Sequence, residues 1–273
     1  MNGTWIDEPM DEPEDRDTPD IAQDGDTGAI AAEPEAEAEA APEPVPLPPQ
    51  AQAALDRIEA LADPAKAAEA ADYHKVKRRC LGVPVPLIEE LVAEWRADLS
   101  LEDRIALAAG LWQSDVHEAM VAAAKLLAQA RMRPDDAAWA LICDWTLGFN
   151  GWATADHATT SGQKRLVADP SRIDTVAAWT QSPNMWTRRA ALVITLPYAK
   201  MNFPKDADLA IRETALGWAA SYVTDRDWFI QKSIAWWVRD LSKHDAPRAR
   251  AFLDAHGAGL KSFARKEASR FLT

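Results

Sequence analysis

From about residue 51 to the end, apolar and polar positions follow one another in the pattern of successive helices. The sequence there is rich in Ala, Leu, Glu, Arg and Trp, and it is poor in the β-branched runs and Asn-Gly turns of sheets. Breaking or capping residues divide it into segments of about 10 to 18 residues, the length of ordinary globular helices. These breaks fall at Pro64, 82–86, Ser100, Pro134, Gly148, Pro170, Pro183, Pro204, Pro247 and 257–259. The pattern predicts an all-α fold.

The number of these segments and their short connections suggest how the helices pack. Short connections favour antiparallel neighbours, and about a dozen such helices in series are typical of an α-solenoid of HEAT-like antiparallel helix pairs. No clear sequence repeat marks the pairs. A compact helical bundle is therefore the alternative all-α arrangement.

The segment 227–243 (DWFIQKSIAWWVRDLSK) shows the clearest division into two helical faces. One face repeats apolar residues at i, i+4, i+7 and i+11 and predicts a core stripe of Ile230, Ile234, Trp237 and Leu241. The same spacing, about 200° around the helix, gives a basic stripe of Lys232, Trp236, Arg239 and Lys243. An indole among cations on an exposed face fits a phosphate backbone with a nucleoside against the ring. The alternative is a half-buried tryptophan among solvated charges.

The first fifty residues differ from the rest in composition. They hold 15 of the 43 acidic residues, nine of the 18 prolines and a single basic residue, Arg16. Such low hydrophobicity and high charge leave too little apolar area to offset chain entropy. We therefore predict a disordered acidic tail over residues 1–50 and one folded domain over residues 51–273. Because we find neither a signal peptide nor a membrane-spanning segment, we expect an intracellular, cytoplasmic protein.

The acidic tail hides the charge of the folded part. The whole chain has a formal net charge of −13, but residues 51–273 contain 28 acidic and 29 basic residues. From residue 186 onward there are 15 basic and nine acidic residues, so the cationic surface belongs to the C-terminal half. Nucleic-acid binding depends on such local patches, and the acidic overall balance does not exclude it.

The cysteines and histidines give no sign of a metal site. Cys80 and Cys143 form no CxxC pair, which excludes a four-cysteine iron–sulfur cluster or zinc finger. The five histidines, at positions 74, 117, 157, 244 and 256, show no ligand spacing such as HExxH. We expect neither a metal nor another cofactor.

Two further aromatic segments carry candidate chemistry. In FNGWATADHATT, Trp152 and Asp156 lie one helical turn apart and can share one side of a helix. In PNMWTRRAALVI, Trp186 precedes Arg188 and Arg189, of which at most one can face a given site. Rings, arginines and one buried acid suit a site that holds a cationic nucleotide and stabilises a sugar cation. The ordinary alternatives are a core tryptophan and an aspartate that caps a helix or forms an ion pair.

Six motifs, in order along the chain, resemble those of DNA alkylation repair enzymes of the AlkD type. They are Tyr73 with LGVPVP (81–86), LWQSDVHEAMVAAAKLL (111–127), WATAD (152–156), NMWTRRAALV (184–193), DWFIQKSIAWWVRDLSK (227–243) and LKSFARKEASRFL (260–272). The resemblance covers nearly all of residues 55–273. It implies a HEAT-like-repeat DNA glycosylase that holds duplex DNA in a concave basic groove and excises cationic N3- and N7-alkylated purines.

The resemblance also assigns roles to residues. The catalytic residues it implies are the carboxylate of Asp156 and the indoles of Trp152 and Trp236. The DNA-contacting residues, two from the resemblance and three from the basic stripe, are Arg189, Tyr73, Lys232, Arg239 and Lys243. The family often reads W-D-x-x-D, whereas Ala153 follows the tryptophan here, so we expect local support or substrate preference to differ at this position.

The implied reaction needs no strong general acid, because an alkylated purine already carries a positive charge. Asp156 would stabilise the sugar cation and orient or deprotonate the attacking water. The absence of a lysine nucleophile predicts a monofunctional glycosylase, and the family implies tolerance of bulky adducts without a tight base-flipping pocket. We expect a nucleoid-associated monomer whose partner is duplex DNA containing alkylated purines.

A non-catalytic HEAT-like scaffold that binds DNA or protein is the alternative function, and Ala153 leaves room for it. In a scaffold that binds protein, the acidic tail would be the functional part. In a repair enzyme, the same tail would instead compete with DNA for the basic groove.

Overall fold

The computed structural model describes residues 46–272 of the chain. The chain divides into two units, Met1–Pro46 and Leu47–Thr273, and every described helix belongs to the second. Residues 46–272 form fourteen α-helices, two short 3-10 helices and no β-strand, which confirms the predicted all-α fold. The α-helices are α1 (Pro49–Glu59), α2 (Pro64–His74), α3 (Val85–Asp98), α4 (Leu101–Gln113), α5 (His117–Leu126), α6 (Asp136–Leu147), α7 (Trp152–Ala168), α8 (Ile173–Trp179), α9 (Met185–Ile194), α10 (Leu196–Ala199), α11 (Asp206–Ser221), α12 (Trp228–Ser242), α13 (Ala246–His256) and α14 (Ser262–Ala268).

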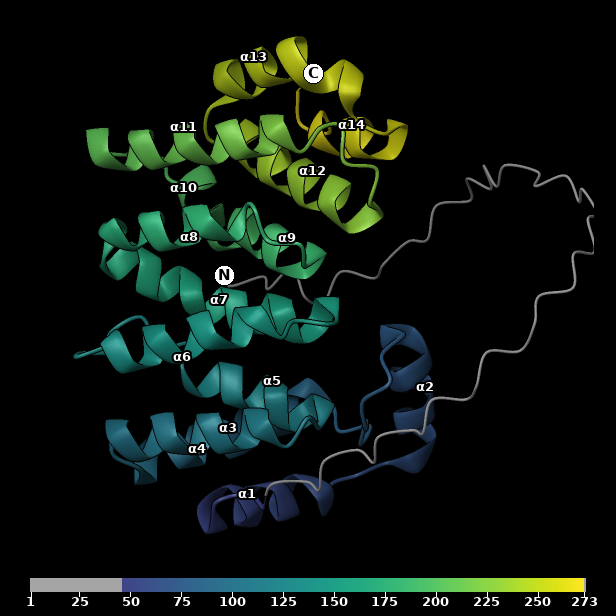
Figure 1. Ribbon diagram of the computed structural model, residues 1–273, viewed down its shortest axis with the longest axis vertical. Helices are drawn as coiled ribbons and strands as arrows, with labels where there is room; N and C mark the ends of the chain where they lie inside the picture. The colour runs from purple at the N-terminus through teal and green to yellow at the C-terminus, as the bar shows by residue number, and fades with distance from the viewer. Residues whose placement is uncertain (1–45, 273) are drawn as a thin grey trace, which may run out of the picture. The chain divides into compact units, whose positions relative to one another are not determined.

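Within the second unit the helices stack broadly in chain order, from α1 at one end to α13 and α14 at the other, while α2 lies to one side of the stack (Figure 1). Helices α5, α7, α9, α12 and α14 touch in succession and form one layer. Helices α4, α6, α8, α11 and α13 lie against this layer, each next to one of its members. Packing between near neighbours along the whole stack is that of an α-solenoid, the predicted architecture.

Local sequence signals set many of the helix starts. The side chains of four residues accept hydrogen bonds from backbone N–H groups in the first turns of α2, α4, α9 and α12, namely Asp63, Ser100, Asn184 and Asp227. The sequence pattern does not predict the break at residues 114–116, which separates α4 from α5. No proline or glycine marks this turn, and Asp115 adopts a positive φ of 50° there.

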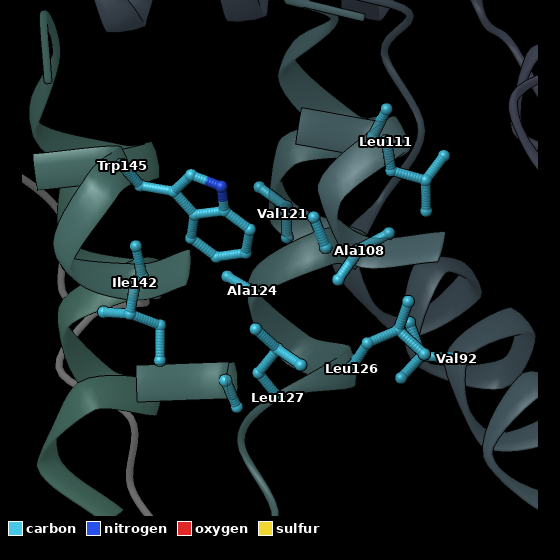
Figure 2. Close-up of a cluster of buried hydrophobic side chains, with 14 of the residues drawn as sticks. Val92, Ala108, Leu111, Val121, Ala124, Leu126, Leu127, Ile142 and Trp145 are labelled. Carbon is cyan, nitrogen blue, oxygen red and sulfur yellow. The ribbon is translucent and has the colours of Figure 1, made fainter. Parts of the chain in front are cut away.

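Apolar side chains from α3, α4, α5 and α6 meet around α5 (Figure 2). The buried residues that Figure 2 labels include Val92, Ala108, Leu111, Val121, Leu126, Ile142 and Trp145. Full burial of one large apolar side chain contributes about 1.5–3 kcal/mol, so this cluster holds α5 firmly between its neighbours. The first residue of the helix fixed in this way is His117.

A buried carboxylate anchors the turn between α2 and α3. The two carboxylate oxygens of Glu118 accept hydrogen bonds from the backbone N–H groups of Leu81 (2.9 Å) and Gly82 (2.7 Å). Gly82 has a φ of 75°, in the left-handed region that favours glycine, and an added Cβ would collide with the backbone of α2. The turn thereby holds α2, which ends with Tyr73 and His74, close to α5.

The predicted acidic tail over residues 1–50 lies largely outside the described residues. The described chain begins at residue 46, Leu47 already packs against the hydrophobic core, and α1 begins at Pro49. None of the helices in residues 46–272 combines the length and the hydrophobicity needed to cross a bilayer.

Candidate active site

Trp152 and Asp156 occupy the first turns of α7, one turn apart, as their spacing predicts. Every residue from 152 to 159 is buried, and Asp156 is only 5 % exposed. The carboxylate of Asp156 therefore requires a partner, because an unpaired buried charge is costly.

Arg189 of α9 is that partner. Its Nη2 donates to Oδ2 of Asp156 at 2.7 Å, and its Nε donates to Oδ1 at 3.3 Å. The third guanidinium nitrogen, Nη1, donates to the backbone carbonyl of Phe229 at 2.9 Å, at the start of α12. Burial raises the pKa of Asp156 above its usual value, and the adjacent guanidinium opposes this rise. One arginine thus joins α7, α9 and α12 around the buried carboxylate.

Two tryptophans and a lysine of α12 lie next to this ion pair. The guanidinium carbon of Arg189 lies 4.9 Å from the ring centroid of Trp236. One turn earlier on α12, the ammonium of Lys232 lies 5.6 Å from the Trp236 ring and 5.7 Å from the Trp228 ring. Trp228, Lys232 and Trp236, at i, i+4 and i+8, are all partly exposed. We call these three residues the α12 row; it is an aromatic and cationic edge beside the buried carboxylate.

The end of α2 meets the start of α7. The ring of Tyr73, which is 44 % exposed, lies edge-on to the Trp152 indole, with centroids 5.6 Å apart. The ring of His74 lies 5.1 Å from the same indole and stacks on His117 at 4.2 Å. Trp152 is therefore held by rings from α2, which are supported in turn by α5.

A buried arginine in the linker after α2 fastens the same region. The Nη1 of Arg78 donates to Oγ1 of Thr154 at 2.8 Å, and its Nη2 donates to the side-chain oxygen of Asn150. Its Nε lies 3.3 Å from Oδ1 of Asp115, in the turn before α5. Arg78 thus ties the first turn of α7 to the linker and to the turn between α4 and α5.

The model of one protein family, described as DNA alkylation repair enzyme, matches residues 54–272. The chain belongs to the DNA alkylation repair enzyme family. Membership implies an enzyme that acts in DNA repair and has DNA as its partner. None of the curated proteins compared with the chain matches it significantly.

Solved structures of three bacterial proteins share the fold of this family member. A predicted DNA alkylation repair enzyme from Enterococcus faecalis is 20 % identical, with a TM-score of 0.63, over 78 % of this chain and 97 % of that one. The smu.31 protein of Streptococcus mutans is 19 % identical, with a TM-score of 0.52, over 68 % of this chain and 92 % of that one. AlkD2 from Streptococcus mutans is 18 % identical, with a TM-score of 0.51, over 68 % of this chain and 89 % of that one. At these identities the likeness concerns the fold.

The structure of this repair-family member joins six of the eight predicted site residues by direct contacts. One contact links Tyr73 to Trp152. A second series links four residues in turn, namely Asp156, Arg189, Trp236 and Lys232. Helix α7 carries one member of each group, since Trp152 and Asp156 lie one turn apart on it.

The other two predicted site residues, Arg239 and Lys243, lie toward the C-terminal end of α12. The prediction that Arg239 lies on an exposed face is wrong, because it is 4 % exposed and its guanidinium pairs with Glu267 of α14 and with Asp240. The ammonium of Lys243 is partly exposed and lies 3.6 Å from Asp240 and 4.6 Å from the Phe271 ring.

Two further predictions concern the core stripe of α12 and the role of Arg189. The predicted core stripe of α12 is confirmed, since none of its members has measurable exposure: Ile230, Ile234, Trp237 and Leu241. Arg189, which the resemblance assigned to DNA, is 2 % exposed and engaged with Asp156 and Phe229.

Four residues of the site escaped the sequence analysis: His74, Arg78, His117 and Phe229. The first three lie in segments whose spacing to Trp152 carries no periodic signal, because α2, α5 and α7 meet only in the folded stack. Phe229 stands inside a motif already singled out, and its backbone carbonyl, which no side-chain pattern reveals, is the atom that matters.

This arrangement offers a fixed anionic group, indole faces and a basic edge. Carboxylates and aromatic faces both stabilise nearby positive charge. Within the described part of the chain, no group of three or more His, Cys, Asp or Glu side chains is arranged to hold a metal ion.

Proposed function

We propose that this family member is a DNA glycosylase that hydrolyses the N-glycosidic bond of cationic N3- or N7-alkylated purines in duplex DNA. The observation that carries the proposal is the buried carboxylate of Asp156, held by Arg189 beside the indole of Trp236 and one turn from Trp152. A fixed carboxylate among aromatic faces is suited to a transition state whose positive charge lies on a sugar.

The reaction would begin with cleavage of the bond between C1′ and the purine nitrogen. The bonding electrons leave with the base and cancel its positive charge, so the leaving group needs no proton. The deoxyribose gains oxocarbenium character, which Asp156 and the indoles of Trp152 and Trp236 stabilise.

Water would then attack C1′ and lose its proton. Oδ1 of Asp156 makes the longer of the two contacts with Arg189, at 3.3 Å, and retains capacity to accept a hydrogen bond from this water. The proton passes to the carboxylate or to solvent, and the product is an abasic site with an intact strand. Arg189 serves this step by keeping Asp156 anionic and oriented.

DNA would lie along the partly exposed α12 row and reach Tyr73. Lys232 is suited to a backbone phosphate and Trp228 and Trp236 to stacking on nucleosides. Lys243 extends the basic edge toward the C-terminal end of α12. Arg239 has no place on this surface, because Glu267 and Asp240 bind its guanidinium.

The deciding experiment measures free 7-methylguanine and 3-methyladenine released from methylated duplex DNA. We expect the wild-type protein to release both bases, and Asp156→Asn to lose release by about 10²-fold or more while binding DNA with similar affinity. Asp144→Asn, an exposed aspartate on α6, is the matched control and should behave as wild type. Absence of released base from the wild type would favour the non-catalytic scaffold, and release by Asp156→Asn at the wild-type rate would rule out the mechanism.

The same reaction mixtures test whether the enzyme is monofunctional. Strands should remain intact until alkali or heat cleaves the abasic sites. Borohydride should trap no covalent complex, because no lysine attacks C1′ in this mechanism.

A further inference from the structure

The indole N–H of Trp152 is buried and finds no hydrogen-bond acceptor within residues 46–272. Contacts with neighbouring rings, and not a hydrogen bond, therefore restrain the indole. The rings that touch it belong to Tyr73, edge-on at 5.6 Å, and to His74, tilted at 5.1 Å. Tyr73 is partly solvent-exposed, whereas His74 is backed by further protein. His74 is therefore the more buried of the two rings that contact the indole.

His74 is itself supported by His117 at the start of α5. The two imidazole rings stack at a centroid distance of 4.2 Å and an interplanar angle of 23°. The backbone N–H of His117 donates to the carbonyl of Arg79 at 2.9 Å, which ties His117 to the linker after α2. Trp152, His74 and His117 thus form a column of rings that runs from α7 through α2 to α5.

We propose that the stacked imidazoles of His74 and His117 are positioning residues that hold the indole of Trp152 against the deoxyribose of the bound lesion. This inference rests on the proposed glycosylase function. Sequence analysis gave neither histidine a role in catalysis, and neither touches the reacting atoms in the proposed mechanism.

The charge of the column bears directly on its role. An imidazolium beside Trp152 would repel the sugar cation that the site has to stabilise, so both rings must be neutral during the reaction. Burial, together with the positive charge of Arg78, lowers the pKa of His74. Burial, followed by His74 and Arg78, lowers the pKa of His117 to about 3. The column is accordingly uncharged near neutral pH.

The other titratable groups on the surrounding elements leave this conclusion intact. They include Tyr73, Asp115, Glu118, Lys125, Asp156 and His157. The three carboxylates are already engaged, Asp115 by Arg78, Glu118 by the turn at Gly82, and Asp156 by Arg189. Burial, followed by Lys125 and the two column histidines, lowers the pKa of His157 to about 3, so it adds no positive charge.

The test measures single-turnover excision and DNA affinity from pH 5 to pH 8 for wild type, His74→Ala, His74→Phe and His117→Phe. We expect His74→Ala to excise about tenfold more slowly at pH 7.5 while DNA affinity changes by less than about twofold, because the indole loses its support. His74→Phe keeps a ring and should stay within about threefold of wild type. His74→Phe should also lose less activity than wild type as the pH falls, since it cannot acquire the charge. His117→Phe should keep the wild-type pH dependence, because His117, with a pKa of about 3, stays neutral over this range.

His256→Ala is the matched control, because His256 also contacts an aromatic ring, Phe252, but lies in α13. Its rate and pH profile should equal those of wild type. The proposal is overturned if His74→Ala excises at the wild-type rate, if it loses affinity and rate to the same extent, or if His74→Phe shows the wild-type acid limb. Thermal melts identify a variant that fails to fold, and the pH profile of His74→Phe then decides. Release of base by wild type and its loss in Asp156→Asn report separately on the proposed function.

Discussion

The two ends of α12 carry the same kinds of residue and use them differently. Near its start, Lys232 lies between two indoles and the neighbouring Arg189 holds a buried carboxylate. Near its end, the guanidinium of Arg239 pairs with Glu267 of α14 and with Asp240. A basic stripe on a helix therefore has no fixed function. The acids that lie beside each cation, on the same helix or on a neighbouring one, decide whether that cation can meet a ligand or supports the fold.

The largest effect should follow removal of Arg189, the arginine of α9 that lies beside the start of α12. Arg189→Met leaves Asp156 buried without a counter-charge, which typically destabilises a protein by about 3–5 kcal/mol. Excision should fall by about 10²-fold or more, because the carboxylate would take up a proton and lose its orientation. Single-turnover excision and urea unfolding measure the two effects. Restoration of stability, but not of excision, in the double variant Asp156→Asn/Arg189→Met would identify the pair as the source of both losses.

The corresponding change at the other end should affect the fold alone. Arg239→Met removes the partner of Glu267 and should destabilise the protein by about 1–3 kcal/mol. Excision by the folded variant should remain within about threefold of wild type. A loss of excision comparable to that of Arg189→Met would contradict the division of α12 into a functional and a structural end.

Acid titration tests the buried histidines near the site. Burial lowers the pKa of His117 and His157 to about 3, below the ordinary value of 6.5, so the unfolded chain binds more protons than the folded one between these limits. Stability should be greatest above pH 6.5 and should decline as the pH falls toward 3. Each histidine contributes on the order of 1 kcal/mol per pH unit in this window. In urea titrations, His157→Gln should flatten this dependence on pH.

The smallest expected effect is on the salt dependence of DNA affinity, and it follows substitution of Lys232 or Lys243. Lys232→Ala should reduce the slope of log affinity against log salt by about 0.9, as expected for loss of one phosphate contact. Lys243→Ala should reduce it less, because Asp240 already holds part of its ammonium charge. Lys164→Ala, an exposed lysine on α7, is the control and should leave the slope unaltered. An unchanged slope for Lys232→Ala would remove the α12 row from the DNA surface.

Sequence periodicity predicted the helices, the core stripe of α12 and the shared placement of Trp152 and Asp156 on one helix. These features depend on residues close together in the chain, where the helical repeat acts directly. The motif order also led to Arg189, although its pairing with Asp156 depends on the contact between α7 and α9.

The sequence pattern could not predict features that depend on contacts between distant segments. Glu267 lies 28 residues beyond Arg239, and nothing in the pattern of α12 indicates that α14 returns over it. The pair of His74 and His117 depends on an unmarked turn at residues 114–116 and on the anchoring of Gly82 by Glu118. Stacked rings from different helices leave no spacing that counting along the sequence detects.

Contact between successive helices also sets an order of assembly. Residues of α2, α7, α9 and α12 must all be in place before the carboxylate and its aromatic neighbours come together, and α14 packs over α12. During synthesis from the N-terminus, the early helices can associate with their neighbours as they emerge, as in other solenoids. The complete site, however, forms only when nearly the whole chain has left the ribosome, so a truncated or stalled chain would carry a partial stack without a working centre.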